Sequence, residues 1–230
     1  MTRVKICGLM SEADVEMAVS AGADSLGFVT EYLVPVPWNL SRARSAELAA
    51  SAPPFVTTTA VVGGRVDEVV AIARAVRPHF LQLHGDETME EIRAVCEALA
   101  PAGIKVLKAL RINVATGEAL FAVRDPVEAC AFLEQSGIAG LVLDSKTSSR
   151  PAGTGVPLDW SSLRRVREHI SLPLILAGGL TSGNVRKAID MVRPYAVDVI
   201  SGVEREAGVK DSQLMRDFVN AVKAPVDQDR

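Results

Sequence analysis

The sequence predicts a single domain with the (β/α)8-barrel fold. Short apolar runs alternate with amphipathic segments of helical spacing along the 230 residues, and no linker interrupts them. Such alternation is typical of parallel strands joined by helical crossovers. Eight units in a chain of this length fit a closed barrel. An open, doubly wound sheet is less favoured, because only Cys7 and Gly8 stand where a dinucleotide fingerprint would need several glycines.

Each predicted strand is a short run of apolar or β-branched residues that ends at a glycine or a polar residue. The third run is rich in threonine, and we expect Thr57 or Thr59 to face the barrel interior. The runs cover residues 4–7, 25–30, 55–62, 79–83, 104–110, 140–144, 174–177 and 197–200.

The predicted helices are recognised by their caps and breakers. Ser11 and Asp14 form a variant of the capping box at the first helix, and Gly22 closes that helix. Thr181 is the expected cap of the seventh helix. The seventh helix is expected over residues 181–191. The other helices cover about residues 41–50, 67–76, 87–100, 113–135, 161–169 and 211–222.

Two segments are expected to lack regular structure. Residues 31–40 contain Pro35 and Pro37, which interrupt any helix or strand pattern. Residues 225–230 form a polar tail that we expect to be disordered. The barrel domain is therefore predicted to occupy residues 1–224.

Composition narrows the class of partner. The chain is 48% hydrophobic and 23% charged, with a net charge of −3 and no cluster of Lys or Arg, so we expect neither nucleic acid nor a membrane as a partner. No apolar run approaches the roughly 20 residues that span a bilayer. The three cysteines are odd in number and widely spaced, which favours a reducing cytoplasm. The helix faces are conventionally amphipathic, so a monomer is expected, with a homodimer as the alternative.

Residues 140–159 are the most distinctive stretch. An apolar run stops at Asp144, and a polar loop with Gly153 and Gly155 follows. The carboxylate could transfer a proton, and the glycines would let backbone amides approach an anion. An equally weighted alternative is a surface turn in which Asp144 only accepts hydrogen bonds from loop amides.

Two further glycine turns indicate a phosphate site. In (β/α)8 barrels the active site lies at the carboxyl ends of the strands, and the loops after strands seven and eight commonly bind phosphate. Here those loops contain Gly178 and Gly179, just before Thr181, and Ser201 and Gly202. Amides at a helix start would be available to an anion. Ordinary glycine turns are the alternative, which the recurrence at both expected places disfavours.

The remaining candidates indicate proton transfer without a metal. Cys7 ends the first strand and could be a general base, although a small buried hydrophobic residue is the more frequent role of a free cysteine. His84 is expected at the barrel mouth, as a substrate contact or as structural polar support. No Cys, His and carboxylate set has metal-ligand spacing, so we expect no metal and no cofactor. A thiol, a carboxylate and a phosphate site suggest isomerisation of a sugar phosphate.

At these strand ends the sequence resembles the phosphoribosylanthranilate isomerase family of tryptophan biosynthesis. The matches occur in the family's order and span nearly the whole chain. They are VKICG at 4–8, LQLHGDE at 81–87, LVLDSK with GTG at 141–155, LILAGGL at 174–180, and AVDVISGVE followed by G and KD at 196–211.

The resemblance implies a reaction and roles for residues. The family converts N-(5-phosphoribosyl)anthranilate into 1-(2-carboxyphenylamino)-1-deoxyribulose 5-phosphate without a cofactor, on a (β/α)8 barrel. By this resemblance Cys7 is the general base that takes the C2 proton, and Asp144 is the general acid that protonates the ribose ring oxygen. The glycine turns would bind the phosphate, and Asp198 would lie near the substrate.

One position departs from the family pattern. Family members commonly carry an Arg after the second strand that pairs with the anthranilate carboxylate, and here Trp38 stands at that place. An indole cannot clamp a carboxylate with two charge-assisted hydrogen bonds, although it could stack on an aromatic ring. Arg111, Arg150 or Lys146 could supply the missing charge. The alternatives are a sugar-phosphate isomerase with a shifted substrate and a non-catalytic barrel that binds a sugar phosphate.

Overall fold

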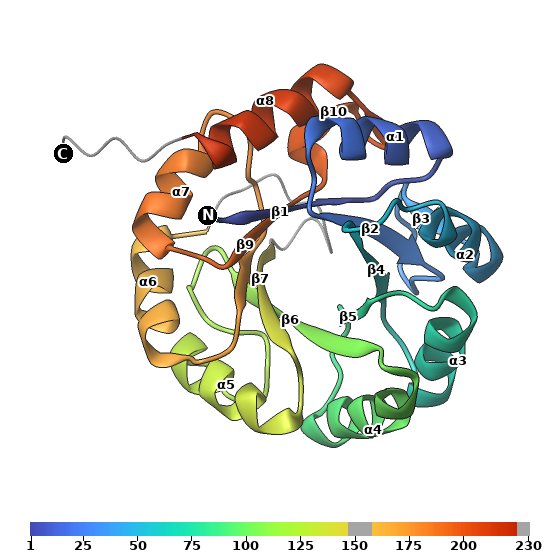
Figure 1. Cartoon of the computed structure of the whole chain (residues 1–230). Helices are drawn as coiled ribbons and strands as arrows, with labels where there is room; N and C mark the ends of the chain where they lie inside the picture. Colours follow the sequence, from blue (N-terminus) through green and yellow to red (C-terminus); the bar gives the residue numbers. More distant parts are fainter. Residues whose placement is uncertain (147–157, 225–230) are drawn as a thin grey trace.

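A computed structural model of the chain describes residues 1–146 and 158–224. Within this part of the chain, eight parallel strands form a closed barrel, because β1 pairs with β2 on one side and with β9 on the other. Figure 1 shows the helices as a ring around these strands. The predicted fold is confirmed. The barrel strands are β1 (Arg3–Cys7), β2 (Ser25–Thr30), β4 (Thr57–Val62), β5 (Phe80–Leu83), β6 (Lys105–Asn113), β7 (Gly140–Lys146), β8 (Leu174–Leu176) and β9 (Ala196–Val199).

The helices follow the strands in the expected alternation. The capping box of the first helix is confirmed, because Ser11 Oγ accepts from the Asp14 amide and Asp14 accepts from the Ser11 amide. Gly22 closes that helix at a φ of 91°. The helices are α1 (Glu12–Ala21), α2 (Arg42–Ala50), α3 (Val66–Val76), α4 (Met89–Leu99), α5 (Pro126–Leu133), α6 (Trp160–His169), α7 (Val185–Val192) and α8 (Ser212–Lys223), with 3-10 turns at Ala100–Ala102, Glu134–Ser136 and Ser201–Val203.

The prediction of a mainly helical segment over residues 113–135 was wrong. Strand β6 runs on to Asn113, and the helix α5 occupies only Pro126–Leu133. Asn113 Oδ1 accepts from the amides of Ala115 and Thr116, so its side chain starts a turn. Helix α5 begins only where Asp125 caps it and a proline fits the first helical position.

Two short pairings add to the barrel. The prediction that residues 31–40 hold no regular structure was wrong at their end, where β3 (Asn39–Leu40) pairs in parallel with β2. After the last barrel strand, β10 (Glu204–Glu206) and β11 (Val209–Lys210) form an antiparallel hairpin. The expected tail at 225–230 lies outside the described residues. None of the helices in the described ranges is long and apolar enough to cross a membrane.

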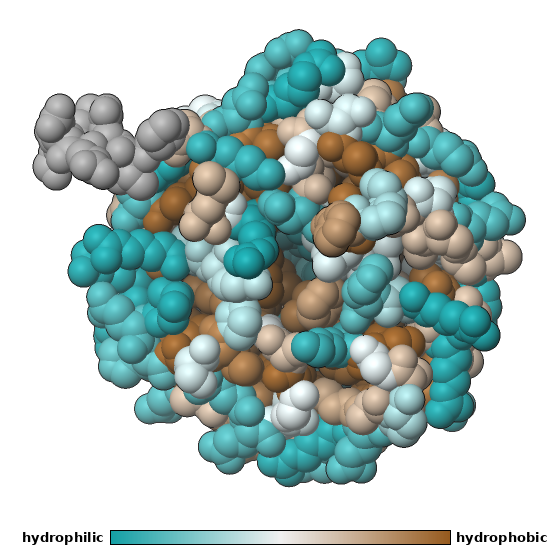
Figure 2. Space-filling model, in the orientation of Figure 1, coloured by the Kyte–Doolittle hydropathy of each residue, from teal (hydrophilic) through white to brown (hydrophobic). Residues whose placement is uncertain are grey.

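Alternation along each strand separates two cores. Residues on one face, such as Val4 and Ile6 of β1, pack against the helices. The opposite faces point into the barrel, where an apolar interior cluster forms from the buried residues Leu107, Ala109, Val142, Ile175, Ala177 and Ala196. Figure 2 shows hydrophilic side chains over the outer ring and hydrophobic ones toward its centre.

The threonine-rich strand β4 fits the same rule. Val61 belongs to a small apolar cluster with Cys7, so its face points into the barrel. Thr59 lies two residues earlier on this face, and its hydroxyl is 3.2 Å from that of Ser25 on the neighbouring strand. The expectation that Thr57 or Thr59 faces inward is therefore confirmed for Thr59.

Candidate functional site

Period-two alternation carries five of the predicted residues to the barrel mouth, the end where the strands finish. Cys7 lies at the end of β1, His84 directly after β5, Arg111 near the end of β6, Asp144 on β7 and Asp198 on β9. Arg111 and Asp144 are paired in the register of the two neighbouring strands. An acid, a base candidate and a cation that the sequence singled out therefore lie at the same end of the barrel.

Cys7 is almost completely buried, with 2% of its surface exposed. It packs with Val29, Trp38 and Val61 in the small cluster at the mouth. Gly27 faces it from the neighbouring strand β2, and a Cβ atom at position 27 would lie 2.5 Å from Cys7 Sγ. A glycine is therefore required at position 27 to give the thiol its room.

A buried ion pair lies beside the thiol. Lys5, two residues before Cys7 on the same face of β1, donates to Asp198 Oδ2 at 2.7 Å and to Gln82 Oε1 at 3.1 Å. Both charged side chains are 6% exposed. Asp198 Oδ1 is buried and has no hydrogen-bond partner among the described residues. Asp198 was expected near the substrate, and here one oxygen is bound by Lys5 while the other remains available.

These charges act on the acidity of the thiol. Burial raises the pKa of Cys7 above its ordinary value, while the neighbouring Lys5 and Lys210 act against this rise and Asp198 adds to it. Burial also acts to lower the pKa of Lys5, but Asp198 and Cys7 outweigh it, so the pKa of Lys5 is raised. Lys5 is therefore a fixed positive charge next to the thiol.

The sequence reasoning missed Lys5. Its signal was the alternation in VKIC, where Lys5 and Cys7 share one face while Val4 and Ile6 share the other. A lysine on the inward face of a barrel strand is expensive to bury without a partner. The position should therefore have indicated a buried carboxylate close to the thiol.

Asp144 on β7 lies beside His84, which directly follows β5. Its Oδ2 is 3.3 Å from His84 Nε2, and the two side chains are 14% and 9% exposed. The alignment does not meet the angle of a hydrogen bond, and Nε2 has no such partner in the described ranges. Asp144 Oδ1 accepts from the amide of Ser145, as the surface-turn alternative expected, but the inward position beside His84 goes beyond that alternative.

His84 is fixed by its neighbours. Its Nδ1 is 3.2 Å from Gln82 Nε2, so the side chain of Gln82 touches both Lys5 and His84. Tyr32 Oη donates to the His84 carbonyl oxygen at 3.0 Å, and the two rings meet edge to face at 6.2 Å. One glutamine therefore links Lys5, which lies beside the thiol, to His84, which lies beside the Asp144 carboxylate.

Trp38 forms a wall of the mouth beside Cys7. The side chain is buried, and its ring lies close to Gly8. Its Nε1 donates to Glu204 Oε1 at 2.6 Å, and Lys210 Nζ binds the same oxygen at 2.8 Å. The Trp38 indole is therefore held by a buried ion pair that comes from the far end of the chain.

Arg111 is the cation nearest to Asp144 in the strand register. Its side chain is 7% exposed, and Nη2 pairs with Asp86 Oδ1, a carboxylate that is 80% exposed. Asp86 belongs to the loop between β5 and α4. Lys108 fixes this loop from the outer face of β6, by donating to the Gly85 carbonyl oxygen at 2.8 Å and to Glu87 at 2.5 Å.

The phosphate prediction is corrected in one respect. Thr181 does not cap a helix, because α7 begins at Val185 after Asn184. Asn184 instead accepts from the Thr181 amide and donates to the Gly179 carbonyl oxygen, which closes a turn before the helix. The helix-start amides are therefore displaced by several residues from the glycines, and only the amides of the turn itself lie where the prediction put them.

The two glycine turns lie against each other and against β7. Gly178 and Gly179 have φ values of 87° and 63°, which favour glycine. A Cβ atom at Gly178 would collide with Ser145, and one at Gly202 would collide with the Leu180 carbonyl oxygen. The other predicted glycines, at 153 and 155, lie outside the described residues.

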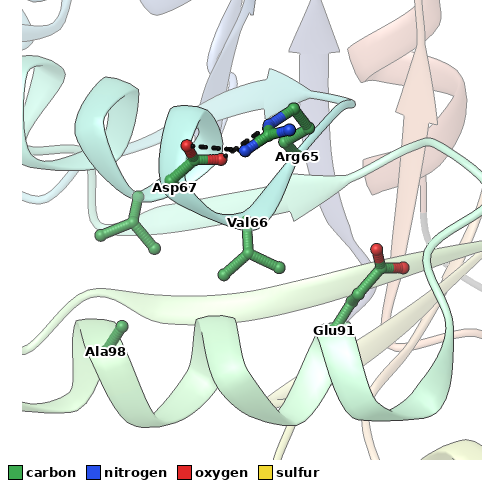
Figure 3. A pocket seen from close by; sticks show the side chains of 6 residues that line it. Arg65, Val66, Asp67, Glu91 and Ala98 are labelled. Atoms are coloured by element: carbon green, nitrogen blue, oxygen red, sulfur yellow. Dashed lines mark hydrogen bonds and ion pairs between the residues drawn. The ribbon is translucent and has the colours of Figure 1, made fainter.

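A groove on the outside of the barrel is separate from the mouth. It is an open groove of about 620 Å³ between α3 and α4, lined by Arg65, Val66, Asp67, Val70, Glu91 and Ala98. Figure 3 shows Arg65 and Asp67 bound to each other at the start of α3, with Glu91 and Ala98 on the helix opposite. These side chains offer neither a nucleophile nor a convergent set of polar groups, so the groove is no candidate active site.

Comparison with known proteins identifies the family of this chain. A sequence model described as N-(5'phosphoribosyl)anthranilate (PRA) isomerase matches residues 4–221. The chain belongs to this family. The resemblance noted from the strand-end motifs is thereby confirmed.

Individual members of the PRA isomerase family agree over the full length. The N-(5'-phosphoribosyl)anthranilate isomerase of Pseudomonas fluorescens is 42% identical over 222 residues, covering 96% of this chain and 98% of the relative. The isomerase of Haloferax volcanii is 39% identical over 226 residues, covering 97% and 94%.

Solved structures of PRA isomerases share the barrel. The Thermotoga maritima enzyme, in a structure described as monomers of the dimeric isomerase, superposes with a TM-score of 0.79 at 30% identity, covering 98% of this chain and all of the other. A PRA isomerase in complex with reduced 1-(o-carboxyphenylamino)-1-deoxyribulose 5-phosphate superposes with a TM-score of 0.75 at 30% identity, with the same coverage.

Proposed function

We propose that this protein is the isomerase that converts N-(5-phosphoribosyl)anthranilate into 1-(2-carboxyphenylamino)-1-deoxyribulose 5-phosphate in tryptophan biosynthesis. The observation that carries the proposal is the family match over residues 4–221 in a chain with a thiol and a carboxylate at the same barrel mouth. The reaction moves protons and opens a ring, and its overall redox change is internal to the substrate. It therefore needs no external oxidant, reductant or cofactor.

Asp144 is proposed as the general acid. Protonation of the ribose ring oxygen lets the bond from C1 to that oxygen break, and the anthranilate nitrogen then forms an iminium with C1. Asp144 faces the interior of the barrel beside His84, at 3.3 Å from its Nε2. His84 lies beside the carboxyl group and offers a second polar group to the substrate.

Cys7 is proposed as the general base. It takes the proton from C2 of the iminium, which gives an enolamine, and the enolamine becomes the ketone when C1 gains a proton. The thiolate is the form that accepts a proton, and burial disfavours it. The buried ammonium of Lys5 stabilises the thiolate and so offsets part of the rise in the pKa of Cys7 that burial causes.

The phosphate is proposed to bind at the loops that follow β7, β8 and β9. Supporting features are the positive φ values of Gly178 and Gly179 and the close approach of the two turns, in which Gly202 packs against the Leu180 carbonyl oxygen, so that backbone amides of both turns lie near each other. Ser201 would add a hydroxyl, and Gly153 and Gly155 complete the proposed set by resemblance. Asp198 is proposed to contact a ribose hydroxyl through Oδ1.

The cellular setting follows from composition. We place the reaction in the cytoplasm, since the three free cysteines fit a reducing compartment. A monomer is proposed, with a homodimer as the alternative, and the Thermotoga maritima relative is described as dimeric.

A second candidate function is an isomerase with a shifted substrate. The observation that favours it is Trp38, which is buried at the place expected for a carboxylate-binding Arg and is already bonded to Glu204. A non-catalytic barrel is disfavoured, because binding alone needs neither Cys7 nor Asp144.

Loss of the fluorescence of N-(5-phosphoribosyl)anthranilate tests the proposal. Turnover by the wild-type protein is expected at micromolar or lower enzyme concentration. A folded protein that binds the reduced product analogue but gives no turnover would reject the isomerase and leave a binding barrel. Turnover only of a substrate that lacks the ring carboxylate would favour the shifted-substrate candidate.

A further inference from the structure

The proposed substrate carries a carboxylate on its aromatic ring, and the Trp38 wall offers no cation to bind it. The only polar atom of the indole donates to Glu204. Lys210, the cation behind that wall, is fully buried and bound to the same carboxylate and to the Ile200 carbonyl oxygen. The carboxylate must therefore find its partner elsewhere in the mouth.

Four cations are buried in the described ranges, namely Lys5, Lys108, Arg111 and Lys210. Three of them are paired with a carboxylate that is itself buried, at 6% exposure or less: Asp198, Glu87 and Glu204. Such a pair resists exchange, because the displaced carboxylate would be left as an uncompensated buried charge.

Arg111 is the exception. Its partner Asp86 is 80% exposed, so water can solvate the Asp86 carboxylate as soon as it leaves. Arg111 lies on the inward face of β6, in register with Asp144. Its positive charge acts to lower the pKa of Tyr32, a residue that packs with the cluster of Cys7 and Trp38. A planar guanidinium also has enough donors to bind a carboxylate at two points.

We infer that Arg111 binds the ring carboxylate of the substrate. In the free protein Arg111 pairs with Asp86, and the substrate carboxylate then replaces Asp86 in this ion pair. The identity of the ligand rests on the proposed function, whereas the exchangeable pair rests on the geometry alone. Asp86 is then an internal competitor that sets how strongly the site selects a carboxylated substrate. Trp38 supplies the apolar wall for the ring, and Arg111 supplies the charge.

The test compares two substrates, N-(5-phosphoribosyl)anthranilate and the matching aniline compound without the carboxylate. Arg111→Met is expected to raise KM for the carboxylated substrate by about 10- to 150-fold, the range for one charged hydrogen bond. Its KM for the aniline compound should stay unchanged, which controls for folding. Arg111→Lys should fall between wild type and Arg111→Met, because it keeps the charge without the planar fork.

Asp86→Asn removes the competitor and is expected to lower KM for the carboxylated substrate by at least about 1.5- to 5-fold, the range for an exposed ion pair, since only Asp86 of this pair is exposed. The aniline compound should again show no change. Asp67→Asn is the matched control, since Asp67 is an exposed carboxylate paired with Arg65 in the groove between α3 and α4.

Two results would overturn the inference. An equal rise of KM for both substrates in Arg111→Met would make Arg111 structural, and an unchanged or raised KM in Asp86→Asn would show that Asp86 does not compete with the substrate.

If the wild-type protein turns over neither substrate, the proposed function fails. Calorimetry with the reduced carboxyphenylamino-deoxyribulose phosphate and its decarboxylated form then decides. A loss of affinity in Arg111→Met confined to the carboxylated compound keeps the inference, and equal losses reject it.

Discussion

The two sides of the barrel mouth are built differently. On the thiol side, Lys5, Cys7 and Asp198 are all nearly inaccessible, and the ion pair is closed at 2.7 Å. On the carboxylate side, Asp144 is partly exposed, and Arg111 is held by a carboxylate that lies in solvent. The charges on the thiol side are fixed in a buried ion pair, whereas Arg111 on the carboxylate side can exchange its ion-pair partner.

The difference corresponds to the two proposed chemical tasks. A thiol that must remove a proton from carbon benefits from a fixed position beside a permanent cation, because that cation stabilises the thiolate that burial disfavours. A carboxyl group that must donate a proton and be reprotonated needs access to solvent or substrate. The same side can therefore also accept a charged part of the substrate.

The largest expected effect is on the free energy of unfolding, and its size should differ between variants of the two sides. Asp198→Ala leaves Lys5 buried without a counter-charge and is expected to lower the free energy of unfolding by about 3–5 kcal/mol. Asp86→Ala removes a partner that is 80% exposed and leaves Arg111 unpaired at the barrel mouth, so it should cost less than Asp198→Ala, although more than the ~0–1 kcal/mol of a fully exposed pair. Urea unfolding of both variants measures the difference. Equal losses would show that the two ion pairs are not different in kind.

Gly27→Ala is expected to have the next largest effect. The new methyl group would press on Cys7 Sγ, which costs about 1–3 kcal/mol of stability and moves the thiol away from its position. The rate constant kcat should fall while KM changes little. Gly183→Ala is the control, because its Cβ would meet only Thr181 at 3.8 Å, and it should stay within about 0.5 kcal/mol. Full activity in Gly27→Ala would show that the thiol position is not critical.

The pH dependence tests the fixed charge on the thiol side. The thiolate is the active form, so kcat/KM should rise with pH through the raised pKa of Cys7. Lys5→Met removes a charge that lowers this pKa, so the rising limb should move to higher pH. Asp198→Asn removes a charge that raises it, so the limb should move to lower pH. A limb that stays in place in both variants would exclude Cys7 as the titrating group.

Much of the architecture was predictable because it depends on local patterns. Period-two alternation and terminal glycines gave eight strand ends, and the strand ends gave Cys7, His84, Arg111, Asp144 and Asp198 as neighbours. The segment over residues 113–135 was misjudged because its apolar residues fit a helix, while the turn that Asn113 starts depends on one side chain.

The partners across the mouth could not be predicted. Trp38 and Glu204 are 166 positions apart in the sequence, and Lys5 and Asp198 are 193 apart. No local pattern encodes which carboxylate meets which cation when several lie at the same end of a barrel. The Thr181 cap failed because the Asn184 side chain binds the Thr181 amide and the Gly179 carbonyl oxygen in a turn that precedes the helix.

The most direct test of the division of labour is a kinetic isotope effect with substrate deuterated at ribose C2. Cys7→Ser should slow proton removal, so a large primary isotope effect on kcat is predicted. Asp144→Asn should slow ring opening, which precedes proton removal, so its isotope effect should be close to one. The same large effect in both variants, or the reverse pattern, would contradict the assignment of Cys7 as base and Asp144 as acid.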